Sequence, residues 1–189
     1  MALPTREEAK KILEKYVKDD YQRFHALMVA TAMEGYAKKL GQDGELWFLT
    51  GYLHDLDYFL HPTTHPGPSL EWFKDWGYPD ELIQAVLAHA NGFNGFAIKP
   101  ESLLDKALIA CDEICGIFYA YQKLNPVPFG EMKASSILKR LRELKFAPKI
   151  DRLHIENGCK DFGVKQEEHA TNLIEFFKNL PLPNNNQKT

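Results

Sequence analysis

The sequence predicts an all-α protein, a compact single-domain helical bundle, on three observations. Apolar residues recur at spacings of three and four along nearly the whole chain, which is the period of a helix buried on one face. Capping residues, prolines and glycines divide the chain into segments of helix length. No segment alternates apolar and polar residues between turn signals, as a strand would, and there is no internal repeat or obvious domain linker.

Helix start and stop signals set the expected elements. A capping box of Thr5 and Glu8 precedes the first helix, Gly41 stops the second, and the prolines after Asn125 break the longest. The tail from Pro181 to Thr189 is polar, and we expect it to be disordered. The expected helices cover about residues 5–18, 20–40, 44–60, 68–77, 79–91 and 100–124, with two or three more within 131–146, 149–157 and 165–180.

Composition restricts the classes of partner. The chain has 189 residues, 44% hydrophobic and 26% charged, which is ordinary for one globular domain. A net charge of −3 creates no positive field that would attract nucleic acid or an anionic membrane. No apolar run approaches the roughly 20 residues that span a bilayer. We therefore expect neither nucleic acid nor membrane as a partner.

The cysteines and the first residues indicate a cytoplasmic protein. Three cysteines without a CxxC pair argue against a disulfide framework and against a structural zinc module. Cys111 and Cys115, four residues apart in an apolar run, are expected to be small buried hydrophobic side chains. The first eight residues lack the apolar stretch of a secretory signal.

Several ionisable residues occupy positions where a helical core should be apolar. His25 and His89 each share a helix face with apolar residues, and His54-Asp55 follows the run 46–53. Asp112 and Glu113 interrupt an apolar stretch over 107–118. Burying an ionised carboxylate alone costs several kcal/mol or neutralises it. One divalent cation inside the bundle would compensate all of them, because imidazole and carboxylate are its usual ligands.

Each of these residues also has a simpler interpretation. His25 or His89 alone could be a hydrogen-bonded core histidine, and Asp112 could cap a helix or pair with a lysine. The dipeptide His54-Asp55 could be exposed near a helix end. Their joint placement on four helices favours the metal site.

The order His25, then His54-Asp55, then Asp112 resembles the H…HD…D signature of the HD-domain superfamily of metal-dependent phosphohydrolases, in its small stand-alone members. The segments Leu53-His54-Asp55-Leu56-Asp57 and Ala110-Cys111-Asp112-Glu113 are similar to the family's local contexts. The resemblance implies one metal held by His25, His54, Asp55 and Asp112. It also implies a single domain over residues 1–180, with a core over about 20–120 and a helical extension over about 130–180.

Some members of this family add two histidines and a second metal. His65 and His89 match those positions here, and His61 competes with His65 as the loop histidine. His154 and His169 lie outside the pattern and are expected to be surface or structural residues. The resemblance therefore implies one or two divalent ions, and Mn, Fe, Zn, Ni, Co and Mg are not distinguished.

The implied activity is hydrolysis of a small phosphate ester or nucleotide by metal-activated water. Asp55 would be a metal ligand or bridge, and Asp57 and Glu113 are candidates to relay a proton or orient a ligand, unless they are exposed acids or lysine partners. Arg23 is the candidate for binding the substrate phosphate. Lys99 is another candidate, whereas the remaining basic residues suit the solvated side of an amphipathic helix: Lys133, Lys139, Arg140, Arg142 and Lys145.

Two other functions use the same residues. A dinuclear-iron oxygenase of the HD fold has the ligand set proposed above, and a non-catalytic ligand-binding module could retain it. The cyclic-dinucleotide phosphodiesterase subgroup is disfavoured, since Asp57-Tyr58 follows the HD pair and Asn91-Gly92-Phe93 follows His89. A (p)ppGpp hydrolase shares only the core.

Overall fold

Side-chain caps start five of the nine α-helices in the described residues, and a glycine in the left-handed region ends two of them. The computed structural model describes residues 3–183. Within that range it contains nine α-helices, a 3₁₀ turn and no β-strand, which confirms the predicted all-α class. The elements are α1 (Arg6–Tyr16), α2 (Asp20–Leu40), α3 (Gly44–Leu53), α4 (Gly67–Asp75), α5 (Asp80–His89), α6 (Leu103–Leu124), η1 (Phe129–Glu131), α7 (Ala134–Arg142), α8 (Arg152–Phe162) and α9 (Gln166–Phe177).

Caps set the ends of the two longest helices. The Asp19 side chain accepts a hydrogen bond from a backbone amide at the start of α2. The same helix ends at Gly41, whose φ of 67° lies in the left-handed region that favours glycine. Both ends agree with the prediction. α6 starts later than predicted, because Ser102 and Asp105 form a capping box just before and inside its first turn.

The third helix is shorter than predicted. The prediction extends it to about residue 60, but α3 ends at Leu53 and residues 54–60 form consecutive turns. Amides in these turns bond to carbonyls three residues earlier, as Tyr58 does to Asp55 at 3.1 Å. This tighter path places the Asp57 carboxylate in the interior, where it is fully buried and accepts a hydrogen bond from His65. That bond compensates part of the cost of burying the carboxylate.

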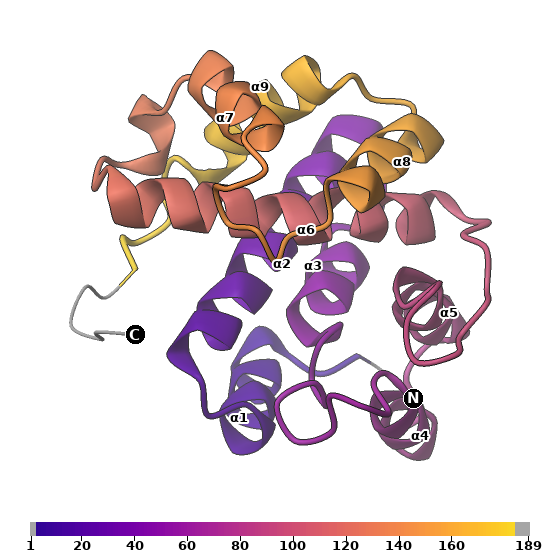
Figure 1. Cartoon of the computed structure of the whole chain (residues 1–189). Helices are drawn as coiled ribbons and strands as arrows, with labels where there is room; N and C mark the ends of the chain where they lie inside the picture. The colour runs from indigo at the N-terminus through magenta and orange to yellow at the C-terminus, as the bar shows by residue number, and fades with distance from the viewer. Residues whose placement is uncertain (1–2, 184–189) are drawn as a thin grey trace.

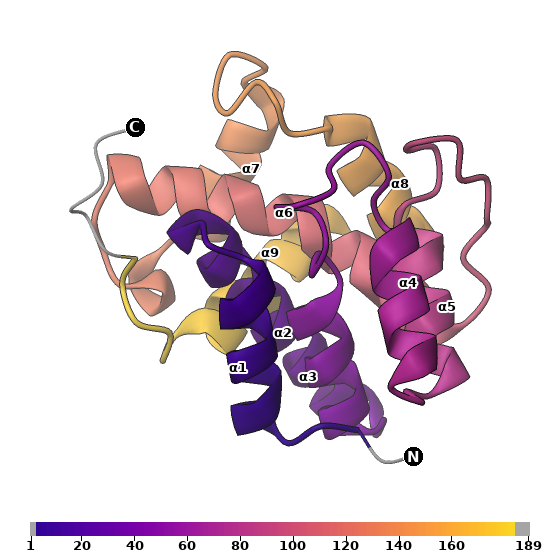
Figure 2. The ribbon, with the colours of Figure 1, turned by 90° about the horizontal axis from the view of Figure 1, so that it is seen from below.

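α6 is the central element of the bundle. It packs against α2, α3, α5, α7 and α8. Figure 1 shows α6 crossing the molecule, with α7, α8 and α9 above it and α1, α4 and α5 below. Figure 2 shows α4 and α5 packed side by side at one edge. Because most of α6 is buried and apolar, Asp112 and Glu113 lie within the body of the protein.

The remaining predictions fare unevenly. Three helices form after residue 130, but α8 covers Arg152–Phe162 rather than 149–157. All three cysteines are buried and unpaired in disulfides. Of the tail expected to be disordered, residues 184–189 lie outside the described residues, as do residues 1–2 of the segment examined for a secretory signal. No helix within 3–183 is long and apolar enough to cross a membrane.

A buried histidine joins α9 to α2 and α6. His169 is fully buried, and its Nε2–H donates to the carbonyl of Ala110 at 2.9 Å, since a carbonyl only accepts. Its Nδ1 therefore accepts from the Tyr36 hydroxyl at 2.6 Å, and that hydroxyl also accepts from Asn172 at 3.2 Å. Burial lowers the pKa of His169 to about 4. The ring is thus neutral at pH 7 and stabilises the helix that carries Asp112.

We expect His169 to make folding acid-sensitive. Its pKa is about 4 when folded and about 6.5 when unfolded. The stability it contributes is fully present above pH 6.5 and is lost as pH falls towards 4, by about 3 kcal/mol in total. His169→Gln removes this titration. Urea unfolding at pH 7 and pH 4.5 should therefore show a smaller loss of stability in the variant than in the wild type, with exposed His61→Gln behaving as wild type. Equal losses in His169→Gln and wild type would contradict this assignment.

Candidate metal centre

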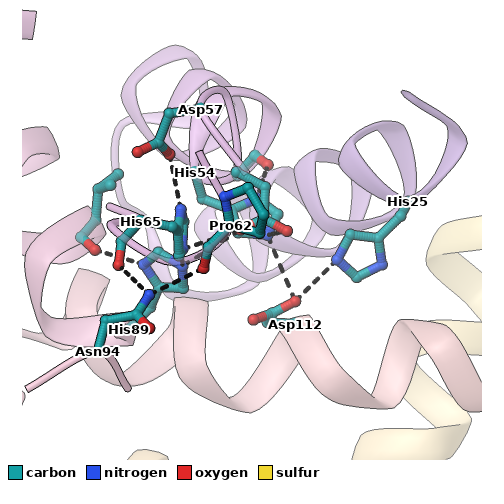
Figure 3. Close-up of polar contacts among 11 residues, drawn as sticks. His25, His54, Asp57, Pro62, His65, His89, Asn94 and Asp112 are labelled. Carbon is teal, nitrogen blue, oxygen red and sulfur yellow. Dashed lines mark hydrogen bonds and ion pairs between the residues drawn. The ribbon is translucent and has the colours of Figure 1, made fainter. Parts of the chain in front are cut away.

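Six of the residues predicted from the sequence meet inside the bundle. His25 lies on α2, His54 and Asp55 directly after α3, His65 before α4, His89 at the end of α5, and Asp112 on α6. Figure 3 shows His25 and Asp112 on one flank of the cluster and His65 and His89 on the other, with His54 between them. Residues from five parts of the chain therefore converge on one point.

A close approach of α3 to α2 delivers His54 to this point. A Cβ on Gly51 would lie 2.9 Å from the backbone N and Cα of Ala30, so only glycine fits between the two helices. His54 is fully buried, and its Nδ1 lies 2.8 Å from the Gly51 carbonyl. Because that carbonyl only accepts, Nδ1 carries the proton and Nε2 presents a lone pair.

The same tautomer follows for the next two histidines. Nδ1 of His89 lies 2.5 Å from the carbonyl of Val86. Nδ1 of His65 lies 2.7 Å from Oδ1 of the buried Asp57. Each Nδ1–H donates to an oxygen, so each neutral ring keeps a lone pair on Nε2. These two Nε2 atoms are 3.2 Å apart, and two lone pairs at that distance repel unless a positive charge lies close to both.

The two oxygens of Asp55 face different parts of the cluster. Oδ2 lies 3.4 Å from Nε2 of His54. Oδ1 lies 3.4 Å from Nε2 of His65 and 3.6 Å from Nε2 of His89. Asp55 therefore presents one oxygen to His54 and the other to His65 and His89.

Asp112 joins the first of these groups. Its Oδ1 lies 2.9 Å from Nε2 of His25 and 3.4 Å from Nε2 of His54. The His54 Nε2 atom is buried and has no hydrogen-bond partner among the described residues. An unsatisfied buried nitrogen beside two carboxylates is costly unless a cation completes it.

The electrostatics of the cluster favour positive charge. Burial opposes charge on His54, but the carboxylates of Asp55 and Asp112 outweigh it and hold its pKa well above the ordinary value. Burial likewise opposes ionisation of both carboxylates, but His54 keeps their pKa values well below the usual range. Burial lowers the pKa of His89, which is therefore neutral at pH 7. The cluster thus attracts a proton or a metal cation to its centre.

The side chains of the cluster fit a divalent metal ion. Their inward-facing nitrogen and oxygen atoms are hydrogen-bond acceptors that repel one another, and each is of a type that binds metals. Neutral imidazole and carboxylate together suit borderline metals such as Zn, Fe, Mn, Co and Ni. Three groups of side chains could each hold a metal ion, because the ligand atoms within each group lie within 4.8 Å of one another: His25, His54 and Asp55; His54, His89 and Asp112; Asp55, His65 and His89.

The cluster opens into a cavity of about 280 Å³. On one side lie five of the six residues named above, all except His54. Glu113 also lines the cavity; burial and the charge of Asp112 raise its pKa to about 8. The other walls include Tyr21, Tyr58, Phe93, Ile150, Lys149 and His154.

Two cavity residues were missed by the sequence reasoning. The prediction treated His154 as a surface or structural residue and did not single out Lys149, yet both line the cavity. They belong to the segment between α7 and α8 and to the first turn of α8. The available signal was Gly116, a glycine inside an otherwise apolar helix. A Cβ there would lie 2.7 Å from Cδ1 of Ile150, so the glycine marks where this segment approaches α6.

Other predicted residues lie elsewhere. Arg23, proposed from the sequence to bind phosphate, does not line this cavity; its guanidinium donates to the Val17 carbonyl at 2.7 Å and it borders a different cavity. His61 is exposed, so the buried loop histidine is His65. None of the other basic residues considered above lines the cavity either: Lys99, Lys133, Lys139, Arg140, Arg142 and Lys145.

The fold and the cluster define an all-helical protein with buried histidine and aspartate groups that could hold a metal. The model of the HD domain family matches residues 24–154 of the chain. The protein therefore belongs to the HD-domain family, within a superfamily of metal-dependent hydrolases. A search of curated proteins and a search of solved structures each found no match.

The close contact at Gly51 can be tested directly. Gly51→Ala would drive a methyl group into the backbone of α2, so we expect a loss of about 2 kcal/mol in the free energy of unfolding, the cost of overpacking. Gly44→Ala is the matched control, because it lies on the same helix and its Cβ would meet nothing closer than 4.0 Å. Urea unfolding of both variants makes the measurement. A Gly51→Ala protein as stable as Gly44→Ala would contradict the close approach.

Proposed function

We propose that this protein is a metal-dependent phosphohydrolase that hydrolyses a small phosphate ester. Membership of the HD-domain family supports hydrolysis with a metal. The observation that carries the proposal is the cluster of inward-facing acceptors, in which the buried His54 Nε2 has no hydrogen-bond partner among the described residues. Such a cluster, next to a cavity of small-molecule size, is suited to holding a cation beside a substrate.

In this proposal the ligands form two groups. His25, His54, Asp55 and Asp112 hold one ion, as the sequence predicts. His65 and His89 would hold a second ion together with Asp55, which would then be a ligand of both ions. Asp57 keeps the His65 ring in the tautomer that leaves Nε2 free, through the bond of 2.7 Å at Nδ1.

Hydrolysis of a phosphate ester needs only water as the second reactant. A bound divalent cation lowers the pKa of water and withdraws charge from a phosphoryl oxygen. The oxygen of water forms a bond to phosphorus, the bond from phosphorus to the ester oxygen breaks, and the alcohol leaves with a proton. In this proposal Glu113 takes a proton from the attacking water and gives it to the leaving alcohol; its position on the cavity wall next to Asp112 supports this role. The products are inorganic phosphate and the alcohol.

Metal content and phosphate release test the proposal together. We expect purified protein to carry a divalent metal and to release phosphate from at least one phosphomonoester or nucleotide. His54→Ala and Asp55→Ala should each lose most of the metal and at least about 100-fold of the activity. Mutating a residue that only orients a metal ligand already costs about 10–100-fold in metal affinity or activity, and these two residues are themselves the proposed ligands. His61→Ala is the control, since His61 is exposed and outside the cluster.

Two results would contradict the proposal. Undiminished metal content and turnover in both His54→Ala and Asp55→Ala would remove the site from the reaction. Bound iron, with substrate-dependent oxygen uptake and no phosphate release, would support the oxygenase instead.

A bridging Asp55 also predicts how the metal content changes. His89→Ala should lower the number of bound ions from two to one per chain, because in the proposed arrangement His89 is a ligand of the second ion alone. Asp55→Ala should weaken both ions. Elemental analysis of each variant after dialysis against a fixed free metal concentration makes the comparison. One ion per chain in wild type and His89→Ala alike would reject the second site.

A further inference from the structure

The substrate side of the cavity is supplied by the C-terminal part of the chain. Lys149 lies in the segment between α7 and α8, which Figure 1 shows crossing α6. Among the described residues that line the cavity, Lys149 is the one lysine or arginine. Its side chain is exposed and makes no hydrogen bond or ion pair with any residue in the range 3–183. The charge of Lys149 is therefore available to a ligand.

Arg152 holds this segment in a defined position. Its guanidinium donates to the carbonyls of Ala147 at 2.5 Å and Ile150 at 2.7 Å, and also to that of Phe146. Three bonds to one short segment fix its path on either side of Lys149. Ile150 then packs against α6 at Gly116, on the wall of the cavity. The backbone of Lys149 is consequently anchored, while its side chain remains free to reach a ligand.

Aromatic rings border the remaining walls. Tyr21, Tyr58 and Phe93 line the cavity, and each is at least 40% exposed. Tyr21 packs beside His25 with ring centroids 6.0 Å apart, and Tyr58 packs edge-on against His65 at 5.3 Å. Exposed rings next to a metal cluster offer apolar surface to whatever is bound there.

The charges explain what Lys149 would bind. The side chains that face the cavity from the cluster include the carboxylates of Asp55 and Asp112. In the proposed function two divalent ions would face these two carboxylates and favour a phosphate dianion, and Lys149 adds a further positive charge from another wall of the cavity. A lysine is a usual partner of phosphate oxygens, as a mobile point charge.

We propose that Lys149 binds the substrate's phosphate from the side opposite the metal ligands, and that the substrate is a small phosphomonoester with an aromatic or apolar organic group. This inference rests on the proposed function of the same cavity. The phosphate lies between the proposed metal ligands and Lys149, and the organic group lies against Tyr21, Tyr58 and Phe93. The segment between α7 and α8 thereby contributes a phosphate-binding side chain, and the aromatic rings from other parts of the chain select the organic group.

Phosphonates, which the protein cannot hydrolyse at phosphorus–carbon, test binding apart from turnover. Calorimetry would measure phenylphosphonate and methylphosphonate binding to the Mn²⁺-loaded full chain. We expect Lys149→Met to weaken both by roughly 10- to 100-fold, the range for one charge-assisted hydrogen bond. Lys149→Arg should restore part of the affinity. Lys145→Met is the matched control, because Lys145 is exposed on the same segment and outside the cavity. Phenylphosphonate should bind wild type about tenfold more tightly than methylphosphonate, from burial of the ring.

The outcomes separate this inference from the proposed function. If wild type releases phosphate from phenyl phosphate and Lys149→Met binds both phosphonates as tightly as Lys145→Met, the role of Lys149 is refuted and the hydrolase stands. If methylphosphonate binds as tightly as phenylphosphonate, the aromatic or apolar substrate class is refuted. If wild type neither binds a phosphonate nor releases phosphate from any ester, both proposals fail.

Discussion

The structure depends on a set of acceptors that face one another inside a helical bundle. Nε2 of His54, His65 and His89 each present a lone pair, because each Nδ1–H is bonded to an oxygen. The oxygens of Asp55 and Asp112 complete the set. Packing alone cannot stabilise such a group in the interior, since unpaired buried acceptors cost free energy. Divalent cations bound among these atoms would satisfy them.

The rest of the fold can be understood as support for that cluster. α3 ends at Leu53, and the turns that follow direct Asp57 inward to orient His65. Gly51 allows α3 to approach α2 closely enough for His54 to reach the centre. His169 on α9 bonds to the carbonyl of Ala110, two residues before Asp112. α9 thus bonds to the helix that carries Asp112, and Lys149, Ile150 and His154 from the segment around the start of α8 form part of the cavity wall.

The sequence predicted what local chemistry determines and missed what long-range packing determines. Gly41 predicted the end of α2, and ionisable residues on apolar faces indicated His25, His54, Asp55, His89 and Asp112. The family resemblance added His65. α3 ends earlier than predicted, and the turns after it bring Asp57 to His65. This contact crosses the loop, so the local sequence pattern does not indicate it. For the same reason the prediction chose Arg23, which lies outside the cavity, and missed Lys149, which lines it. Proximity in sequence to His25 favoured Arg23, whereas the packing of Ile150 on Gly116 brings Lys149 to the cavity.

Anomalous X-ray diffraction from crystals grown with Mn²⁺ would test the central claim most directly. The account predicts two peaks, one within bonding distance of His54 Nε2 and the other within bonding distance of Nε2 of His65 and His89, with Asp55 beside both. Peaks only at surface carboxylates, with the cluster free of metal at saturating Mn²⁺, would contradict it. In that case protons rather than cations would stabilise the buried acceptors.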